Sequence, residues 1–540
     1  LRCGMVISGI RCHIPCWEAS TATQRSPHTT PAHPPASTPQ PRTTPSGDGP
    51  PAASNAAVKE PGAGAFQAAA AVVDADGIWC SNGAFQPLPG PIGHVGDLVR
   101  LAQWLHLGTQ VTKYRTAAGQ IWVGDELARQ LGIDVESITA AATADHDKVT
   151  REVTRAAAGV TDALRAGYSL GGRDKDALGR WTRVWKGTEQ SVWVVLLAAM
   201  TRDGADVPLM GADPDHATLA RRIGLLASAL GHPYQLSGST TGLDLMTALR
   251  WKDRESFFAR HEPVPPALSN VELDLSWSRK PTAAEADHEF VHAYDRSGSY
   301  LAGVAGLELG VGPATHHPDG TAFVPRMPGY WRIEIPDGGD WRLPNLLDPR
   351  GGNTGKVRWV TTPGLDFAVE QGHEPAILEA YTWTQRARIL DPWYERIRDA
   401  RTALDTDDPD CQVARDQLKA IYAPTIGMFG SQAHMAGRLG YAPERRHHIV
   451  AKARTNILRR VVKIGQDTDR WPVAIVADTV LYTSPDPDPV AAWPGQPEWL
   501  GRALGRYKVE ATGRLADQVK YLTGGPYRGK DALMERDGGG

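Results

Sequence analysis

The sequence predicts an α/β protein of the mixed α+β kind, and three observations support this. Two apolar stretches, HAYDRSGSYLAGV around Asp295 and PVAIVADTVLYTS around Asp478, are typical of strands, and each carries one aspartate. Amphipathic helices are predicted between them, and strands and helices alternate upstream as far as residue 250. Finally, 540 residues are too many for one core, so several domains are expected.

Composition limits the function classes only weakly. The net charge of −3 and the pI near 6.7 exclude a globally basic nucleic-acid binder, so any DNA contact must come from local basic surface. Five scattered cysteines cannot form a disulfide framework, which predicts a reducing, cytoplasmic location. No stretch approaches the roughly 20 apolar residues of a membrane span, so no membrane contact is expected.

The segment 1–64 is expected to be disordered. From Ser20 to Gly64 it consists mainly of Pro, Thr, Ser and Ala, with almost no large apolar side chains to offset the entropy of ordering. The close trio Cys12, His13 and Cys16 lacks the regular spacing of a zinc site.

Order is predicted to begin in the region 65–250, as a mixed α/β domain. Its first element, AFQAAAAVVDADGIWCSNG, is typical of a hairpin with Asp74 and Asp76 at the turn. The Asp74-Ala75-Asp76 pair could open a set of metal-binding carboxylates, but no partner carboxylates are recognisable. A turn rich in Asp and Gly is therefore the favoured interpretation.

Asp295 and Asp478 are the candidate catalytic residues and metal ligands. A carboxylate at the end of a buried strand is costly unless a cation compensates it. Two such strands side by side would hold Mg²⁺ or Mn²⁺, and paired ions can align the oxygens of a phosphoryl transfer. One aspartate alone at a strand end is more often a turn or cap residue, so the interpretation depends on the segments around the pair.

Three of these segments carry basic residues. QLKAIYAPTIGMFGS predicts a helix with Lys419 directed at a triphosphate and an end near Gly427. HHIVAKARTNILRRVVKIGQ predicts an amphipathic helix in a basic run from residue 438 to 460, and a merely solvated face is the alternative. LGRYKVE predicts a short strand suited to primer or template phosphates. The candidate DNA-binding residues on the last two are Arg454, Arg459, Arg506 and Lys508.

In this order the segments resemble the palm and fingers of family B DNA polymerases. Asp295 and Tyr300 match the end positions of the first palm motif, D-x-x-S-L-Y. Lys419 and Gly427 match the fingers motif K-x-x-x-N-S-x-Y-G-K-F-G. ADTVLY matches the third motif, D-T-D-S, when Asp478 takes the second aspartate. The sequence departs from these motifs at Ala423, Pro424, Ile426 and Val476.

That resemblance implies a role for each residue. Asp295 and Asp478 would hold two Mg²⁺, while Lys419 would neutralise the triphosphate of a deoxynucleotide beside Gly427. Tyr300 would stack under the sugar. The region 65–250 stands where that family has its proofreading exonuclease, in degenerate form. The remaining domains would be 270–384 and 437–510 as two parts of the palm, 385–436 as fingers, and 511–540 as a short thumb-like segment.

A closer resemblance runs from about Val72 to about Gly525. The phrases TTGLDLMTALR, RLPNLLDPRG, LDPWYERIRDA, KARTNILRRVVK and ADTVLYTSPDPDP look like the telomere-associated Tap proteins of linear bacterial chromosomes and plasmids. This implies a nucleoid-associated protein that binds DNA ends, single-stranded or duplex, and acts with a separate terminal protein. The N-terminal helix-turn-helix of that family is missing from this chain.

Two functions follow as expectations. The first is telomere replication by a DNA polymerase, a nucleotidyltransferase that adds deoxynucleotides at the ends of a linear replicon, primed by a terminal protein. The second is a catalytically inactive adaptor with the same fold, which binds terminal DNA and recruits the terminal protein. A transcription regulator would need a DNA-reading helix, and the sequence shows none.

Overall fold

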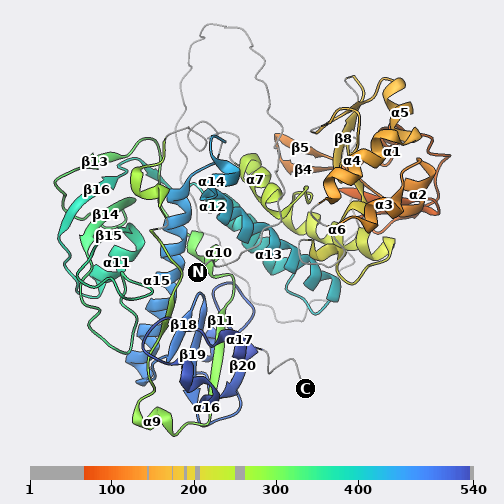
Figure 1. Cartoon of the computed structure of the whole chain (residues 1–540). Helices are drawn as coiled ribbons and strands as arrows, with labels where there is room; N and C mark the ends of the chain where they lie inside the picture. Colours follow the sequence, from red (N-terminus) through yellow and green to blue (C-terminus); the bar gives the residue numbers. More distant parts are fainter. Residues whose placement is uncertain are drawn as a thin grey trace, which may run out of the picture.

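The computed structural model describes residues 66–534 except 143–144, 173, 188–190, 201–206, 250–261, 270 and 439. The segment 1–64, expected to be disordered, lies outside the described residues. The described chain is a mixed α/β structure with several sheets, as the sequence predicts (Figure 1). Among its described helices, none is both long enough and apolar enough to cross a membrane.

The N-terminal region is built on a seven-stranded sheet. Its three central strands, β1, β6 and β9, are mutually parallel and almost fully buried, which explains their continuous apolar runs. In sheet order the strands are β3 (Phe85–Gln86), β2 (Gly77–Cys80), β1 (Ala70–Asp74), β6 (Gln120–Val123), β9 (Val192–Leu196), β8 (Trp181–Trp185) and β7 (Ser169–Leu170).

Helices cover both faces of this sheet. Alternate side chains of the central strands enter two different apolar clusters, one with the short helices α1 to α5 and the other with α6 (His216–Leu230). The short helices are α1 (Asp97–Trp104), α2 (Asp125–Gln130), α3 (Val135–Ala140), α4 (His146–Ala156) and α5 (Ala158–Arg165). A two-stranded hairpin, β4 (Gly108–Thr112) with β5 (Arg115–Ala118), completes the region.

A group of long helices joins this region to the rest of the molecule (Figure 1). It comprises α6, α7 (Gly238–Leu249), α12 (Asp391–Ala403) and α13 (Pro409–Phe429). Helices α7 and α13 approach so closely at Gly238 that no side chain fits there. A Cβ at this position would lie 1.7 Å from the carbonyl oxygen of Ala420. One apolar cluster runs from the seven-stranded sheet through these helices to α10 (Ser299–Val304).

The candidate aspartates belong to a second sheet, of five antiparallel strands. The order is β10 (Ser276–Ser278), β18 (Ala474–Val476), β19 (Thr479–Ser484), β11 (Phe290–Arg296) and β20 (Tyr507–Arg514). Helix α15 (Pro443–Thr468) packs on one face. The other face packs against the C-terminal elements α16 (Leu515–Gln518) and α17 (Lys530–Met534). The short helix α9 (Ala283–Ala286) lies between β10 and β11 in the chain.

A four-stranded sheet lies on the far side of α15 (Figure 1). Its order is β13 (Thr315–His317), β16 (Ile377–Thr382), β14 (Gly329–Glu334) and β15 (Val357–Thr361), and α11 (Thr362–Glu370) follows directly. The short pair β12 (Leu309–Gly310) and β17 (Arg386–Ala387) connects it to the helical group, and α14 (Gln432–Met435) precedes α15.

Helix α15 corrects the prediction of a basic surface helix. Because it passes between two sheets, four of its basic side chains are buried, namely Arg445, His447, His448 and Arg454, whereas its other basic side chains are half-buried or exposed. The Tyr330 hydroxyl and His447 Nδ1 are 2.7 Å apart, and the N–H of Gly329 donates to His448 Nε2. Burial lowers the pKa of His447 to about 4. These residues therefore stabilise the interior instead of forming a phosphate-binding surface.

Candidate functional site

Asp295 and Asp478 are brought to one edge of the five-stranded sheet. Asp295 is the penultimate residue of β11, and Asp478 lies in the two-residue turn between β18 and β19. Strands β11 and β19 are adjacent and antiparallel, with Asp295 opposite Thr479. The N–H of Arg296 donates to the carbonyl oxygen of Asp478 at 2.9 Å. The pairing of β11 with β19 thus brings both aspartates to the same edge of the sheet, although Asp478 lies in the turn just before β19 and not in a strand as the sequence predicted.

The turn that presents Asp478 is strained. Ala477 has φ +51°, a left-handed conformation that costs a non-glycine residue about 1–2 kcal/mol. Its N–H donates to the carbonyl oxygen of Leu275 at 2.8 Å, which fixes the turn against the chain before β10. Strain of this kind persists where surrounding contacts over-determine it and is concentrated at functional sites.

The two carboxylates form a site in which negative charge is only partly compensated. Burial raises the pKa of Asp478 to about 6, and the negative charges of Asp295 and Glu510 act in the same direction, while Lys530 opposes them. Like charges brought together in a medium of low dielectric constant favour protonation or a bound cation. Because the carboxylates offer oxygen ligands only, the hard ions Mg²⁺ and Mn²⁺ suit them.

Two lysines already face this edge. Lys508 Nζ lies 3.3 Å from Asp295 Oδ2. Lys530 Nζ donates to Thr479 Oγ1 at 2.8 Å and pairs with Glu510 Oε1 at 3.0 Å. Lys508 was expected to hold a primer or template phosphate, whereas here it neutralises part of the aspartate charge. Glu510 ends the LGRYKVE segment but was not expected at the site, and Lys530 belongs to none of the segments identified in the sequence.

Tyr300 lies beside Asp478, but its hydroxyl group is engaged. The hydroxyl donates a hydrogen bond to Asp274. Burial and then the Asp274 charge raise the pKa of Tyr300 well above its usual value. A cavity of about 10 Å³ lies beside these side chains. It is lined by Asp274, Tyr300, Arg454 and Asp478 among others. That volume admits about one water molecule.

Helix α13 presents Lys419 and Gly427 to solvent on one face, as expected of residues two turns apart. A Cβ on Gly427 would meet nothing within 4 Å, which leaves its backbone open to approach. Tyr422, on an adjoining buried face, accepts a hydrogen bond from Arg401 and lies near Gly298, three residues after Asp295. Ile426, which replaces the tyrosine of the fingers motif, is buried.

Two of the four predicted DNA contacts are ion-paired on α15. Arg454 pairs with Glu272 at 2.7 Å, and their side chains are only 3% and 2% exposed. Arg459 pairs with Glu370 at 2.8 Å and covers the ring of Phe367. The prediction that Arg454 holds a backbone phosphate is therefore wrong for this structure, because its guanidinium group cannot reach solvent.

The fourth predicted contact, Arg506, lines a cavity of about 560 Å³. This arginine-lined cavity, as we call it, lies between α12, α15 and the loop before β20. Its walls include a group that no sequence motif joined: Arg296, Arg398, Arg460, Glu498 and Trp499. Asp295 does not line it, since successive strand residues point to opposite faces.

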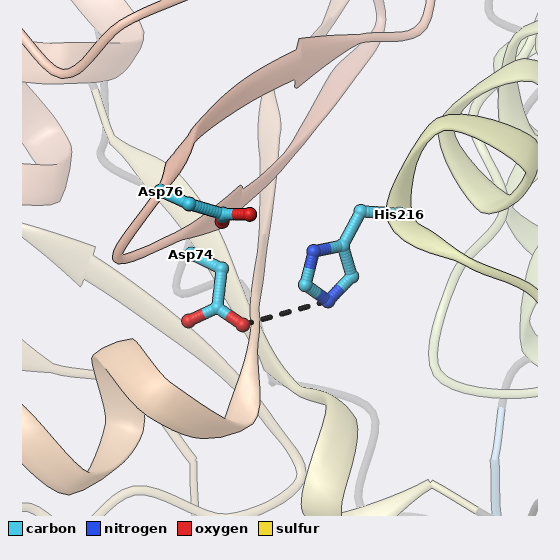
Figure 2. Close-up of side chains that lie close together, drawn as sticks. All are labelled: Asp74, Asp76 and His216. Carbon is cyan, nitrogen blue, oxygen red and sulfur yellow. Dashed lines mark ion pairs between the residues drawn. The ribbon is translucent and has the colours of Figure 1, made fainter.

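A separate cluster lies in the N-terminal region (Figure 2). Asp74 and Asp76 flank the tight turn between β1 and β2, as predicted. Asp74 Oδ1 accepts the N–H groups of Ala75 and Leu127, and its Oδ2 lies 3.5 Å from Nε2 of His216, the first residue of α6. Figure 2 shows the imidazole ring and both carboxylates pointing toward one another.

These three residues offer ligand atoms within 4.8 Å of one another, and no other group of three or more such residues does so in the described part of the chain. Two carboxylates with one imidazole suit Mn²⁺ or Zn²⁺ better than Mg²⁺. His216 could not be recognised from the sequence, because a histidine so far along the chain from Asp74 and Asp76 carries no local signal.

The raised pKa of Asp478 predicts how stability depends on pH. In the unfolded chain Asp478 titrates near its usual value of about 4, and in the folded chain near 6. Between these values the folded state binds more protons, so its contribution to stability is present below pH 4 and is lost as the pH rises through 6. We expect the unfolding free energy of wild type, relative to Asp478→Asn, to fall across this window.

Urea unfolding of both proteins in EDTA, at several pH values from 4 to 7, measures this difference. A difference that stays constant across the window would show that Asp478 keeps an ordinary pKa in the folded protein.

Comparison with known proteins gives matches to solved structures only. No family model and no curated protein sequence matches the chain. Phi29 DNA polymerase with single-stranded DNA is similar at 10% identity over 81% of this chain and 80% of that chain, with a TM-score of 0.40. Its complex with primer-template DNA and incoming nucleotide gives 10% identity, 81% of each chain and a TM-score of 0.42.

Proposed function

We propose that the chain is a DNA-binding replication protein with a family B-like polymerase core that acts at the ends of linear replicons. The single observation that carries the proposal is the edge shared by Asp295 and Asp478, where burial and mutual repulsion raise the pKa of Asp478 to about 6. A half-buried carboxyl group with a raised pKa beside a second carboxylate is typical of functional sites. The order of the sequence motifs specifies which function this edge serves.

In this proposal Asp295 and Asp478 hold Mg²⁺ or Mn²⁺, which supplies the positive charge that a phosphoryl transfer requires. Lys419, exposed on α13, neutralises the triphosphate of a deoxynucleotide, and the open backbone at Gly427 allows that nucleotide to approach. Tyr300 forms the floor under the sugar. Lys508 exchanges its ion pair with Asp295 for a contact with the primer strand. The hydroxyl group of the primer is carried by a terminal protein.

The proposed domain plan keeps the ranges expected from the sequence. The five-stranded sheet with α15 is the palm, contributed by 270–384 and 437–510, although β20 continues to Arg514, and α13 with its neighbours is the fingers, 385–436. The range 511–540 is a thumb-like segment, and the seven-stranded sheet of 65–250 stands in the exonuclease position. The resemblance of five sequence phrases to the telomere-associated Tap proteins supports the role at DNA ends.

The second candidate is a catalytically inactive adaptor that binds terminal DNA and recruits the terminal protein. Two observations favour it: an ammonium group lies 3.3 Å from Asp295 Oδ2, and the cavity beside Asp478 has room for only about one water. Primer extension with purified protein, Mg²⁺ or Mn²⁺, deoxynucleotides and a primer on a terminal protein separates the two. Extension supports the enzyme, whereas DNA binding without extension supports the adaptor.

Lys419→Ala tests the fingers assignment. A charge-assisted hydrogen bond to phosphate contributes about 1.5–3 kcal/mol, so we expect deoxynucleotide affinity to fall about 10-fold or more while DNA affinity changes little. Isothermal titration with a deoxynucleotide and Mg²⁺ measures the first quantity, and fluorescence anisotropy with labelled DNA measures the second. Lys463→Ala, which removes an exposed lysine from α15, is the matched control. Equal nucleotide affinity in the Lys419→Ala and control proteins would place Lys419 outside the site.

A further inference from the structure

The arginine-lined cavity has an excess of positive charge. Four arginines, Arg296, Arg398, Arg460 and Arg506, line it together with one acidic residue, Glu498. One of these arginines, Arg398, also pairs with Asp399 at 2.7 Å. Its volume of about 560 Å³ lies within the range of small-molecule sites. Burial lowers the pKa of Arg460, and the charge of Arg296 acts in the same direction. An anion in the cavity would relieve this repulsion.

Arg296 is the residue that points most clearly to a ligand. It is only 8% exposed, and its Nε and Nη1 atoms are buried without a hydrogen-bond partner among the described residues. A buried donor left unsatisfied costs about 1–3 kcal/mol, and more when it is charged. The guanidinium group lies at the wall of the cavity, 3.3 Å from the position that a Cβ of Gly505 would take. A larger residue at 505 would crowd this group.

The rest of the cavity is shaped to hold its arginines in place. The Arg460 guanidinium carbon lies 3.7 Å from the ring centroid of Trp499, a cation–π contact that fixes the side chain. Arg398 and Arg506 are exposed at the rim. Guanidinium groups bind phosphate oxygens through paired hydrogen bonds. The cavity thus has one buried donor, one fixed donor and two accessible donors for phosphate.

We propose that this cavity binds the terminal phosphate of a nucleotide, with Arg296 as the innermost ligand. A strand that lies across the surface through its internal phosphates cannot reach a side chain that is 92% buried, whereas a terminal phosphate can enter the cavity. Two sources share this chemistry: a free nucleoside triphosphate and the 5′-phosphate of a DNA strand. The site is distinct from the edge of Asp295 and Asp478, and the inference does not depend on polymerase activity.

The binding test uses the full chain in EDTA, where Mg²⁺ cannot hold a nucleotide at the aspartates. Titration with dATP covers the first source. Labelled oligonucleotides with a 5′-phosphate or a 5′-hydroxyl cover the second. The variants are Arg398→Gln combined with Arg506→Gln, which change only rim residues, and Arg296→Met, which removes the innermost ligand. Lys419→Ala is the control for nucleotide bound at α13, and thermal melting confirms that each variant is folded.

We expect dATP, or the 5′-phosphorylated strand in preference to the 5′-hydroxyl strand, to bind wild type and Lys419→Ala equally. The rim variant should bind at least about 10-fold more weakly, the effect of losing a charge-assisted contact. Binding that is lost only in Lys419→Ala would place the nucleotide at the fingers and overturn the inference. Equal binding of both oligonucleotides to all variants, with no dATP binding, would also overturn it.

Discussion

Replacing Asp478 with asparagine is expected to abolish nucleotide transfer and to leave DNA binding intact. The substitution keeps the shape of the side chain but removes one of the two negative charges that would hold Mg²⁺ at the edge of the five-stranded sheet. A metal ion supplies several kcal/mol of transition-state stabilisation, so the rate should fall at least about 100-fold. Primer extension on a terminal-protein primer measures the rate, and anisotropy with terminal DNA measures binding.

Asp488→Asn is the matched control for this experiment. Asp488 is an exposed aspartate in the loop that follows β19, and its Oδ1 atom accepts the N–H of Val490, a bond that asparagine can retain. This variant should extend primers at the wild-type rate. If the Asp478→Asn protein still supports replication of linear ends in cells, catalysis at this edge is wrong and the adaptor function stands.

The largest effect on stability is expected from Arg454→Met. This change leaves Glu272 as a buried charge without its cation, although Thr361 still donates two hydrogen bonds to Glu272 Oε1. Breaking one side of a buried ion pair costs about 3–5 kcal/mol. Urea denaturation should therefore show a lower midpoint with an unchanged slope. A variant too unstable to purify would be examined as Glu272→Gln with Arg454→Met, which removes both charges.

Arg459→Met on the same helix is the control. Its ion pair with Glu370 is partly exposed, at 32% and 53%, and such pairs contribute about 1 kcal/mol or less. If Arg454→Met costs no more than this control, the buried pair does not stabilise the fold. If Arg454→Met instead flattens the salt dependence of DNA binding while stability stays unchanged, Arg454 contacts phosphate after all.

Local patterns in the sequence were sufficient for the elements that carry the candidate site. The apolar run around Asp295 predicted β11, and helical periodicity predicted α13 and α15. The run around Asp478 predicted one strand where the structure has two, β18 and β19. The turn at Asp74 and Asp76 was also predictable, because Asp and Gly favour tight turns through their own backbone preferences. Each of these features depends on residues within a few positions of one another.

The burial of α15 shows what local patterns do not predict. Its basic residues indicated a surface helix, since charged side chains are usually solvated. Whether Arg454 is exposed depends on Glu272, which the chain places far upstream and which only the folded arrangement of two sheets around α15 brings within 2.7 Å. The periodicity of a helix indicates which side chains share a face, but it does not indicate which other elements pack against that face.

The sequence by itself determined β11, α13, α15 and the choice of Asp295 and Asp478, because these depend on local propensity and on side-chain periodicity. Only the tertiary structure decided that Lys508 faces Asp295, that His216 meets Asp74, and that Arg296 and Arg506 share one cavity. These contacts join residues far apart in the chain. Their energies depend on distance, burial and neighbouring charge, and those quantities exist only once the chain has folded.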